Sequence, residues 1–167
     1  STGTGGGDLI NMGGDVALGA DVVVTGAGGA GDDITFFNIV EGAQTLTINA
    51  GPNGDVNFTA GVGGNTPLTG FDVDSAENVI IQGVVTAAGA IQVGNSAGDR
   101  PTLLTLSGDL TSESGGAAGA IAVHADDIVL EAAGGAAGTI TFDSNGTADS
   151  TITITTDAST LRSSTAW

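Results

Sequence analysis

The sequence predicts an all-β fold, a parallel β-helix or β-solenoid, from three observations. Apolar residues recur with a period of two, glycine-rich clusters separate them, and one turn-plus-strand phrase returns several times. A solenoid reuses such a step because each rung buries its apolar face only against its neighbours. At roughly 20 to 30 residues per rung, the chain has room for about six or seven unequal rungs.

The clearest repeat is an Ala-Ala-Gly turn that leads into a strand with two apolar residues on one face. It occurs at residues 87–93, 117–123 and 136–142, so the copies start 30 and then 19 residues apart. A related glycine-rich turn at 27–31 leads into a strand at 34–36. The unequal spacing predicts rungs of unequal length, with the variation held in the loops.

Strands are expected wherever apolar and polar residues alternate, since alternate side chains then share one face. In chain order the apolar pairs are Ile34/Phe36, Leu46/Ile48, Val56/Phe58, Phe71/Val73, Val79/Ile81, Ile91/Val93, Leu104/Leu106, Ile121/Val123, Ile128/Leu130, Ile140/Phe142 and Ile152/Ile154. Gly, Asn and Asp clusters between them predict tight turns. Recurrence favours a β-helix over a sandwich or a barrel, which has no reason to repeat one step.

Composition fits a thin aliphatic core within one domain. Of the 167 residues, 30 are Gly, five are Phe, one is Trp, and Tyr and Cys are absent. We expect a flexible or capping segment over residues 1–13, a solenoid over 14–157 and a tail over 158–167. The first residue is not Met and no apolar run of about 18 residues is present, so we expect a processed or excised segment without membrane insertion.

The charge balance excludes several partners. Nineteen acidic residues face only Arg100 and Arg162, Lys is absent, and the net charge is −17. Such a chain repels phosphate backbones and anionic membranes, so nucleic acid is not an expected partner. The charge keeps a repetitive β protein soluble and would welcome divalent cations or a cationic surface.

One stretch resembles a known family. Residues 44–51 (QTLTINAG) and 54–68 (GDVNFTAGVGGNTPL) are similar to the repeats of large bacterial surface exoproteins of the filamentous-haemagglutinin type. Residues 14–21 and 69–73 resemble the flanking parts of the same repeat. The resemblance is best over residues 14–93, about half the chain.

The resemblance implies a secreted, right-handed β-helical stalk used in adhesion, surface layers or extracellular fibres. We therefore expect a structural or adhesive module at the bacterial surface rather than an enzyme. Its expected partners are other copies bound end to end, neighbouring repeats of a longer chain, surface glycans or a receptor. The alternative is a carbohydrate-binding or carbohydrate-active β-helix with an acidic groove.

The sharpest candidate for a metal site is the run Gly28-Gly29-Ala30-Gly31-Asp32-Asp33. It fits the start of the calcium-binding repeat G-G-x-G-x-D, so Asp32 and Asp33 are candidate Ca²⁺ ligands. The other interpretation is a glycine turn that ends in two solvated carboxylates. Calcium solenoids repeat the motif every nine residues, and nothing here matches nine residues further on.

Catalytic candidates are few. Asp72 and Asp74 alternate in one strand with Glu77 close by, and two carboxylates across a groove can serve as acid and base in glycoside hydrolysis. We interpret them instead as solvent-facing partners of Phe71 and Val73. His124 is the single histidine and lacks companions for a zinc site. No catalytic residue is therefore assigned.

The threonine rows and the N-glycosylation sequons each have a simple alternative explanation. Threonine alternates with apolar residues at 45–47 and 151–155, as it would on an ice-binding face, but Thr also favours any exposed strand. Residues 57–59 and 145–147 fit the N-glycosylation sequon, which often arises by chance.

Overall fold

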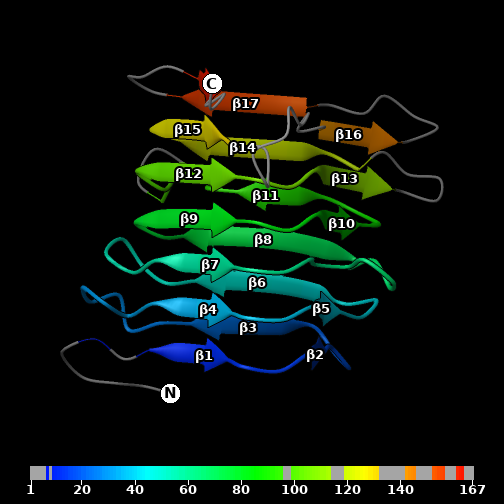
Figure 1. The fold of residues 1–167 in the computed structure, drawn as a ribbon, viewed down its shortest axis with the longest axis horizontal. Coiled ribbons are helices and arrows are strands. Elements are labelled where there is room, and N and C mark those ends of the chain that lie inside the picture. The colour runs from blue at the N-terminus through cyan, green and yellow to red at the C-terminus, as the bar shows by residue number, and fades with distance from the viewer. Residues whose placement is uncertain are drawn as a thin grey trace.

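The structure, a computed structural model, describes residues 7, 9–95, 99–113, 119–131, 142–145, 152–156 and 161–163. Over these residues every regular element is a β-strand, and every strand pairing is parallel. The strands stack as a β-solenoid (Figure 1). The predicted fold class is confirmed.

Three sheets form the three sides of the coil and are called A, B and C. Sheet A contains β1 (Ile10–Met12), β4 (Ile34–Phe36), β7 (Val56–Phe58), β9 (Asn78–Ile81), β12 (Leu103–Leu106), β15 (Asp127–Leu130) and β18 (Leu161–Ser163). Sheet B contains β2 (Val16–Ala17), β5 (Val40–Glu41), β10 (Val85–Ala87), β13 (Leu110–Glu113) and β16 (Phe142–Asn145). Single bridges through Val62 link β5 to β10. Sheet C contains β3 (Val22–Thr25), β6 (Thr45–Asn49), β8 (Gly70–Ser75), β11 (Ile91–Val93), β14 (Ile121–Ala125) and β17 (Ile152–Thr156).

Each turn of the coil passes from sheet A through sheet B to sheet C and then starts the next turn. In Figure 1 the strands of sheet A run to the right in front, those of sheet C run to the left behind, and the chain climbs from β1 to β18. This path is right-handed, the usual hand of parallel crossover connections. The turns that begin at residues 10, 34, 56, 79 and 104 are called the first to the fifth.

The solenoid makes about five turns, slightly different from the six or seven rungs predicted. The strands of sheet A pair at offsets of 22 to 25 residues up to β15, whereas Ile128 pairs with Leu161 much further along the chain. The predicted number of rungs came from dividing the chain length by one average rung length, which does not allow for the longer stretch between Ile128 and Leu161. β1 and β18 also lie outside the predicted solenoid bounds of 14–157, because strands of three residues leave little alternating pattern.

The core is a set of columns of aliphatic side chains, one residue from each turn. In sheet A the column Ile34, Val56, Val79, Leu104 is fully buried, and neighbouring members are paired in register. The inward positions of sheets B and C form matching columns, so the interior is continuous along the axis. Each turn therefore buries its apolar face against the next, as a solenoid requires.

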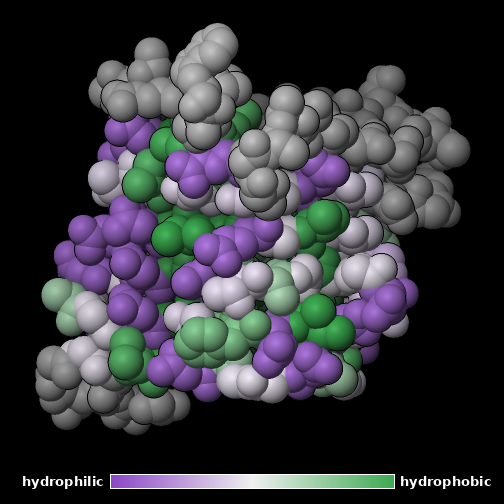
Figure 2. Space-filling model, in the orientation of Figure 1, coloured by the Kyte–Doolittle hydropathy of each residue, from purple (hydrophilic) through white to green (hydrophobic). Residues whose placement is uncertain are grey.

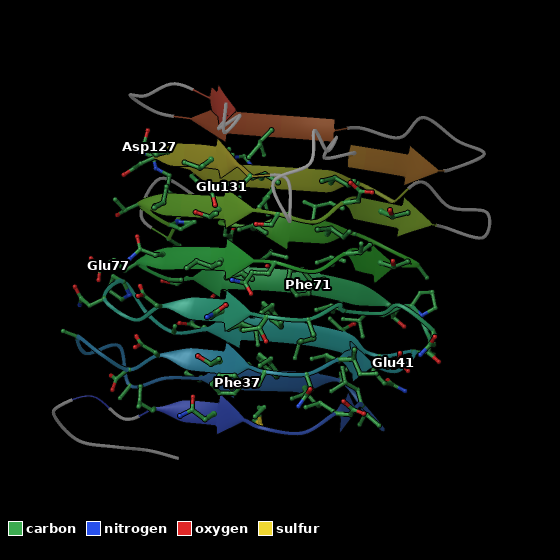
Figure 3. The ribbon with its side chains drawn as sticks, viewed as in Figure 1. Phe37, Glu41, Phe71, Glu77, Asp127 and Glu131 are labelled. Atoms are coloured by element: carbon green, nitrogen blue, oxygen red, sulfur yellow. The ribbon has the colours of Figure 1, made fainter. Side chains whose placement is uncertain are left out.

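Three phenylalanines fill the wide part of this core. The rings of Phe36 and Phe58 stack with centroids 4.8 Å apart and planes 3° apart. Phe71 from sheet C meets Phe58 edge to face at 5.3 Å. All three are essentially fully buried, and Figure 3 shows Phe71 inside the coil. This cluster is the largest block of apolar volume in the second and third turns.

The Ala-Ala-Gly phrase has two different structural outcomes. Its first two copies stack as predicted, with Ile91 paired to Ile121 in sheet C. In the third copy Phe142 begins β16 and pairs with Leu110 in sheet B, while Ile140 lies outside the described residues. Similar turns therefore lead into different sides of the coil, and the phrase does not mark the true repeat of the turns.

One glycine shows how closely successive turns approach at the corners. Gly63 has φ +73°, and a Cβ atom built on it would lie 2.0 Å from the carbonyl oxygen of Thr86 in the next turn. Only glycine tolerates both the backbone conformation and the contact. The abundant glycine is thus a requirement of stacking, at this position at least.

Candidate functional site

Acidic and amide side chains gather where sheet C passes to sheet A. This surface, called the C–A corner, contains Asp33, Asp55, Glu77, Asn78 and Asp127. Figure 2 shows hydrophilic residues along the left edge of the view, and Figure 3 places Glu77 and Asp127 there. Because acidic side chains of several turns meet at this corner, it is the first place to look for a site.

The predicted calcium ligands lie at this corner, but they serve the turn itself. The Asp32 carboxylate accepts a hydrogen bond from the N–H of Gly29, and the Asp32 N–H donates to the Gly29 carbonyl at 3.2 Å. Asp32 is only 3% exposed. Asp33 Oδ1 accepts the N–H of Asp55 in the next turn at 3.0 Å. Both carboxylates thus accept hydrogen bonds from backbone N–H groups, as the interpretation of a structural glycine turn requires. Calcium binding stays a prediction.

Asp33 begins a hydrogen-bonded column that climbs the corner. Asp33 accepts from Asp55, and Asp55 Oδ1 in turn accepts the Nδ2 donor of Asn78 at 2.8 Å. The partners lie 22 and 23 residues apart, one turn of the coil. The corner therefore links three successive turns through side chains, in addition to the backbone ladders.

A second column crosses the outer face of sheet C and contains one of the predicted acids. Asp74 Oδ2 accepts Nδ2 of Asn49 at 3.0 Å, and Asp74 Oδ1 accepts Nδ2 of Asn95 at 3.0 Å. One carboxylate thus joins the turn below to the turn above. A general base needs a free lone pair and a general acid needs a proton on its carboxyl group, whereas both oxygens of Asp74 are used to accept hydrogen bonds from asparagine side chains.

Asp72, the other member of the predicted acid pair, has a different environment. It lies between Thr47 and Gln92 in register, and its Oδ1 atom is buried with no hydrogen-bond partner among the described residues. Partial burial, together with the nearby charge of Asp74, raises the pKa of Asp72 above its ordinary value of 3.8. The two carboxylates share a face as predicted, but Asp74 accepts two hydrogen bonds whereas Asp72 Oδ1 has no partner among the described residues.

The remaining candidates do not come together as a site. His124 faces outward from β14, and its backbone partner in register is Thr155. Thr47 stacks between Val23 and Asp72, so the threonine row is not continued in the adjacent turns. Among the described residues no three His, Cys, Asp or Glu side chains are placed to hold a metal ion.

The sequon at residues 57–59 begins within β7 and ends at Thr59, directly after the strand. Thr59 Oγ1 donates to the carbonyl of Phe37 at 2.8 Å, and Asn57 Oδ1 is buried with no partner among the described residues. The second sequon, at 145–147, extends outside the described residues.

Other polar contacts between turns follow the same principle. Glu41 Oε1 accepts both the backbone N–H and the Nδ2 donor of Asn65, at 3.2 and 2.6 Å. Asp21 Oδ1 accepts the N–H of Thr45 at 2.8 Å. Both pairs are 24 residues apart, again one turn. Sequence reasoning missed these columns, although Asp and Asn recurring at the period of a turn would have revealed them.

The basic residue Arg100 forms an ion pair with Asp126, which precedes Asp127 of the C–A corner. Its Nε atom lies 2.6 Å from Asp126 Oδ1, its side chain is only 17% exposed, and Pro101 after it is buried.

Large apolar side chains are exposed at four described positions: Leu9 (60%), Val23 (68%), Phe37 (49%) and Val84 (45%). Leu9 directly precedes β1 and Val23 lies within β3, both in the first turn, and Figure 3 places Phe37 low in the molecule, near β4. Only one of the four is aromatic, so these residues form no row of stacking platforms of the kind that grips sugars. No helix among the described residues could cross a membrane.

The fold and these contacts define the class of protein, a parallel β-solenoid whose outward polar side chains tie each turn to the next. Comparisons with protein-family models, curated proteins and solved structures find no match.

Proposed function

We propose that the chain is a non-catalytic structural module, a stalk segment or fibre subunit at a bacterial surface, in which the rod itself performs the function. The observation that carries this proposal is the use of the outward carboxylates. Asp33, Asp55 and Asp74 accept hydrogen bonds from adjacent turns. In a β-helical enzyme such residues would line a groove and leave their oxygens to the substrate.

The uninterrupted core supports a mechanical role. Inward positions of the second to fifth turns are buried in all three sheets, so the aliphatic columns continue from turn to turn among the described residues. A load along the axis would be shared among ladder hydrogen bonds, aliphatic columns and polar columns. Such a rod can hold a binding tip away from a cell, or continue neighbouring repeats of a longer chain.

The cell-surface location is proposed from the resemblance of residues 14–93 to filamentous-haemagglutinin-type repeats. The net charge of −17 supports it, because a repetitive β protein displayed in quantity needs mutual repulsion to stay dispersed. Surface glycans or a host receptor would be partners of the tip rather than of these turns.

Labelling of cells tests the location. Antibodies raised against the recombinant chain are applied to the producing bacterium, either intact or permeabilised. Labelling of intact cells, removed by brief treatment with a non-specific protease, is expected. Labelling that needs permeabilisation would overturn the surface assignment.

Deleting a whole turn tests the mechanical role. Removal of residues 56–78 takes β7 from sheet A, the bridging residues Val62 and Leu68 from sheet B and β8 from sheet C, and it brings Val79 into register with Ile34. We expect a folded solenoid shorter by one strand spacing, about 4.8 Å. Removal of residues 56–67 is the control, because it leaves an incomplete turn and should not fold. If both deletions are equally damaging, the turns are not interchangeable units and the proposal fails.

A further inference from the structure

At both ends of the solenoid, the last described strand of each sheet pairs with a described strand on one side only. Among the described strands, β1, β2 and β3 are the last members of sheets A, B and C at one end, and β18, β16 and β17 at the other. We propose that these ends bind each other, so that one copy docks head to tail on the next and forms an unbranched filament. The inference rests on the proposed structural function and names its partner, a second copy of this chain.

The backbone at the first turn is directed for such pairing. In β1 the N–H of Ile10 donates to the carbonyl of Asp33 at 2.8 Å, and the Met12 carbonyl accepts from Phe37 at 3.0 Å, so both residues direct these groups toward β4. Backbone groups in a parallel strand alternate between its two sides, so residues between these point the other way. Sheets B and C follow the same rule. The residues with free-edge groups are therefore Asn11, Ala17, Val23 and Thr25, all with exposed side chains.

The opposite end presents the complementary set. In β15 the N–H groups of Asp127 and Glu131 point back toward β12 of the fifth turn, to the carbonyls of Thr102 and Leu106. By the same alternation, Ile128 directs its backbone groups toward β18. Leu161 of β18, which is paired in register with Ile128, directs its own backbone groups away from β15, toward the open end. A second copy docked in parallel thus repeats the register found between all turns. A copy turned upside down would reverse the order of the three sheets and could match only one side.

The edge of the first turn lacks the usual protection against pairing. Natural edge strands are guarded by charges, prolines or bulges. β1, β2 and β3 read INM, VA and VVVT, without a charged residue or a proline, in a chain of net charge −17. The strands at the other end carry one Asp and one Arg, which cancel. The end strands themselves therefore add no net charge, whereas acidic residues of the first turn, such as Asp15 and Asp21, lie in its loops.

The inward side chains of the first turn are less buried than those of the second turn. Met12 and Val24 are only partly buried, whereas their column neighbours Phe36 and Ile48 are 1% and 0% exposed. Exposed Val23 adds apolar surface on the outer side of the same edge. A docked copy would continue the interface that already joins every pair of turns, both in its ladders and in its core.

Assembly is tested on the full chain across a concentration series by sedimentation and electron microscopy. We expect rods one solenoid wide that lengthen with protein concentration and with added salt, because salt screens the repulsion between acidic copies. A chain that stays monomeric up to its solubility limit overturns the inference, as does a dimer that grows no further.

Two substitutions at one exposed site separate backbone pairing from other effects. Val23→Pro removes a free-edge N–H and no hydrogen bond within the chain, since proline is tolerated at strand edges that face solvent. It should raise the concentration needed for assembly at least about tenfold, the effect of a lost ladder bond and a misfitting ring. Val23→Thr keeps the N–H and the β propensity and should assemble like the parent. Equal loss in both variants contradicts pairing through the backbone.

Hydrogen exchange decides whether another part of the chain already covers this edge. The amides of Asn11 and Val23 should exchange fast in monomers and slowly in rods. Slow exchange in the monomer would assign the edge to a segment of the same chain and overturn the inference. If the protein folds and reaches the cell surface but stays monomeric, the filament inference is wrong and the surface function stands. If it forms filaments but remains inside the cell, the surface function is wrong and the filament inference stands. Circular dichroism checks that each variant folds.

Discussion

The first and third turns are built from the same elements but differ in what surrounds them. Val24 and Val73 belong to one column of sheet C, and Val73 is fully buried while Val24 is partly buried. The difference arises because the third turn has a described neighbour on both sides and the first has one on only one side. The stability of a solenoid is therefore held in the interfaces between turns rather than within each turn.

The polar surfaces differ in the same way. In the third turn Asp74 accepts hydrogen bonds from the turn below and from the turn above. In the first turn Asp21 and Asp33 reach only upward. An end turn thus loses side-chain links as well as core contacts.

The largest effect is expected from the aromatic cluster of the inner turns. Phe58→Ala removes the ring that touches both Phe36 and Phe71, and large-to-small changes at buried Phe cost about 3 to 5 kcal/mol. Chemical denaturation should show this loss in the free energy of unfolding. A loss below about 1 kcal/mol would mean that the core can collapse around the gap.

A glycine in each of the two turns provides the next comparison. Gly63→Ala in the third turn forces a side chain into a positive φ and against the Thr86 carbonyl, and should destabilise by about 2 kcal/mol or more. Gly14→Ala in the first turn has nothing within 4 Å of the new methyl group and should change stability by less than about 0.5 kcal/mol. Equal melting temperatures of the two variants would contradict the close approach at the corner.

The valine column gives the most direct measure of end effects. Val73→Ala should cost about 2 kcal/mol and Val24→Ala about half as much, since less area leaves water when Val24 folds. Both values come from denaturation of dilute monomer. In assembled rods the Val24→Ala penalty should rise toward that of Val73→Ala, and a gap that stays constant on assembly would contradict docking at this edge.

The smallest effect concerns pH. Because the pKa of Asp72 is raised above 3.8, stability from this group is present at low pH and is lost as the pH rises through its raised pKa. Asp72→Asn should therefore be more stable than the parent at pH 7, by less than about 1 kcal/mol because the group is partly solvated. The advantage should vanish below pH 3.8.

Asp74→Asn is the matched control for the pH prediction. The amide keeps one acceptor oxygen but cannot satisfy donors from both Asn49 and Asn95, so this variant should be less stable than the parent at pH 7. If both substitutions shift stability in the same direction, the contrast between the two carboxylates is wrong.

The sequence predicted the strands whose apolar residues alternate in pairs, because period two is a direct record of burial. Ile34/Phe36, Ile91/Val93 and Leu104/Leu106 all face the core as expected. It did not predict β2 and β5, which contain two residues each and have no period to read. Short strands of this kind exist because neighbouring turns impose the ladder on them.

The candidate site was predictable in its residues but not in its role. Asp32, Asp33, Asp72 and Asp74 were all recognised from local spacing. Their partners lie one turn away, as in the contact between Asn49 and Asp74, and local spacing contains no information on that distance. Only the period of the turns, 22 to 25 residues in the first five, brings them together.

The ion pair of Arg100 has a consequence for proteolysis. Trypsin cuts after Lys or Arg and fails when Pro follows; this chain has no Lys, and Arg100 precedes Pro101. The Arg100 side chain is moreover largely buried against Asp126. The other basic residue is Arg162, close to the end of the sequence. A trypsin-like enzyme therefore finds no usable bond from residue 1 to residue 161, and the whole rod should survive in a medium rich in such proteases.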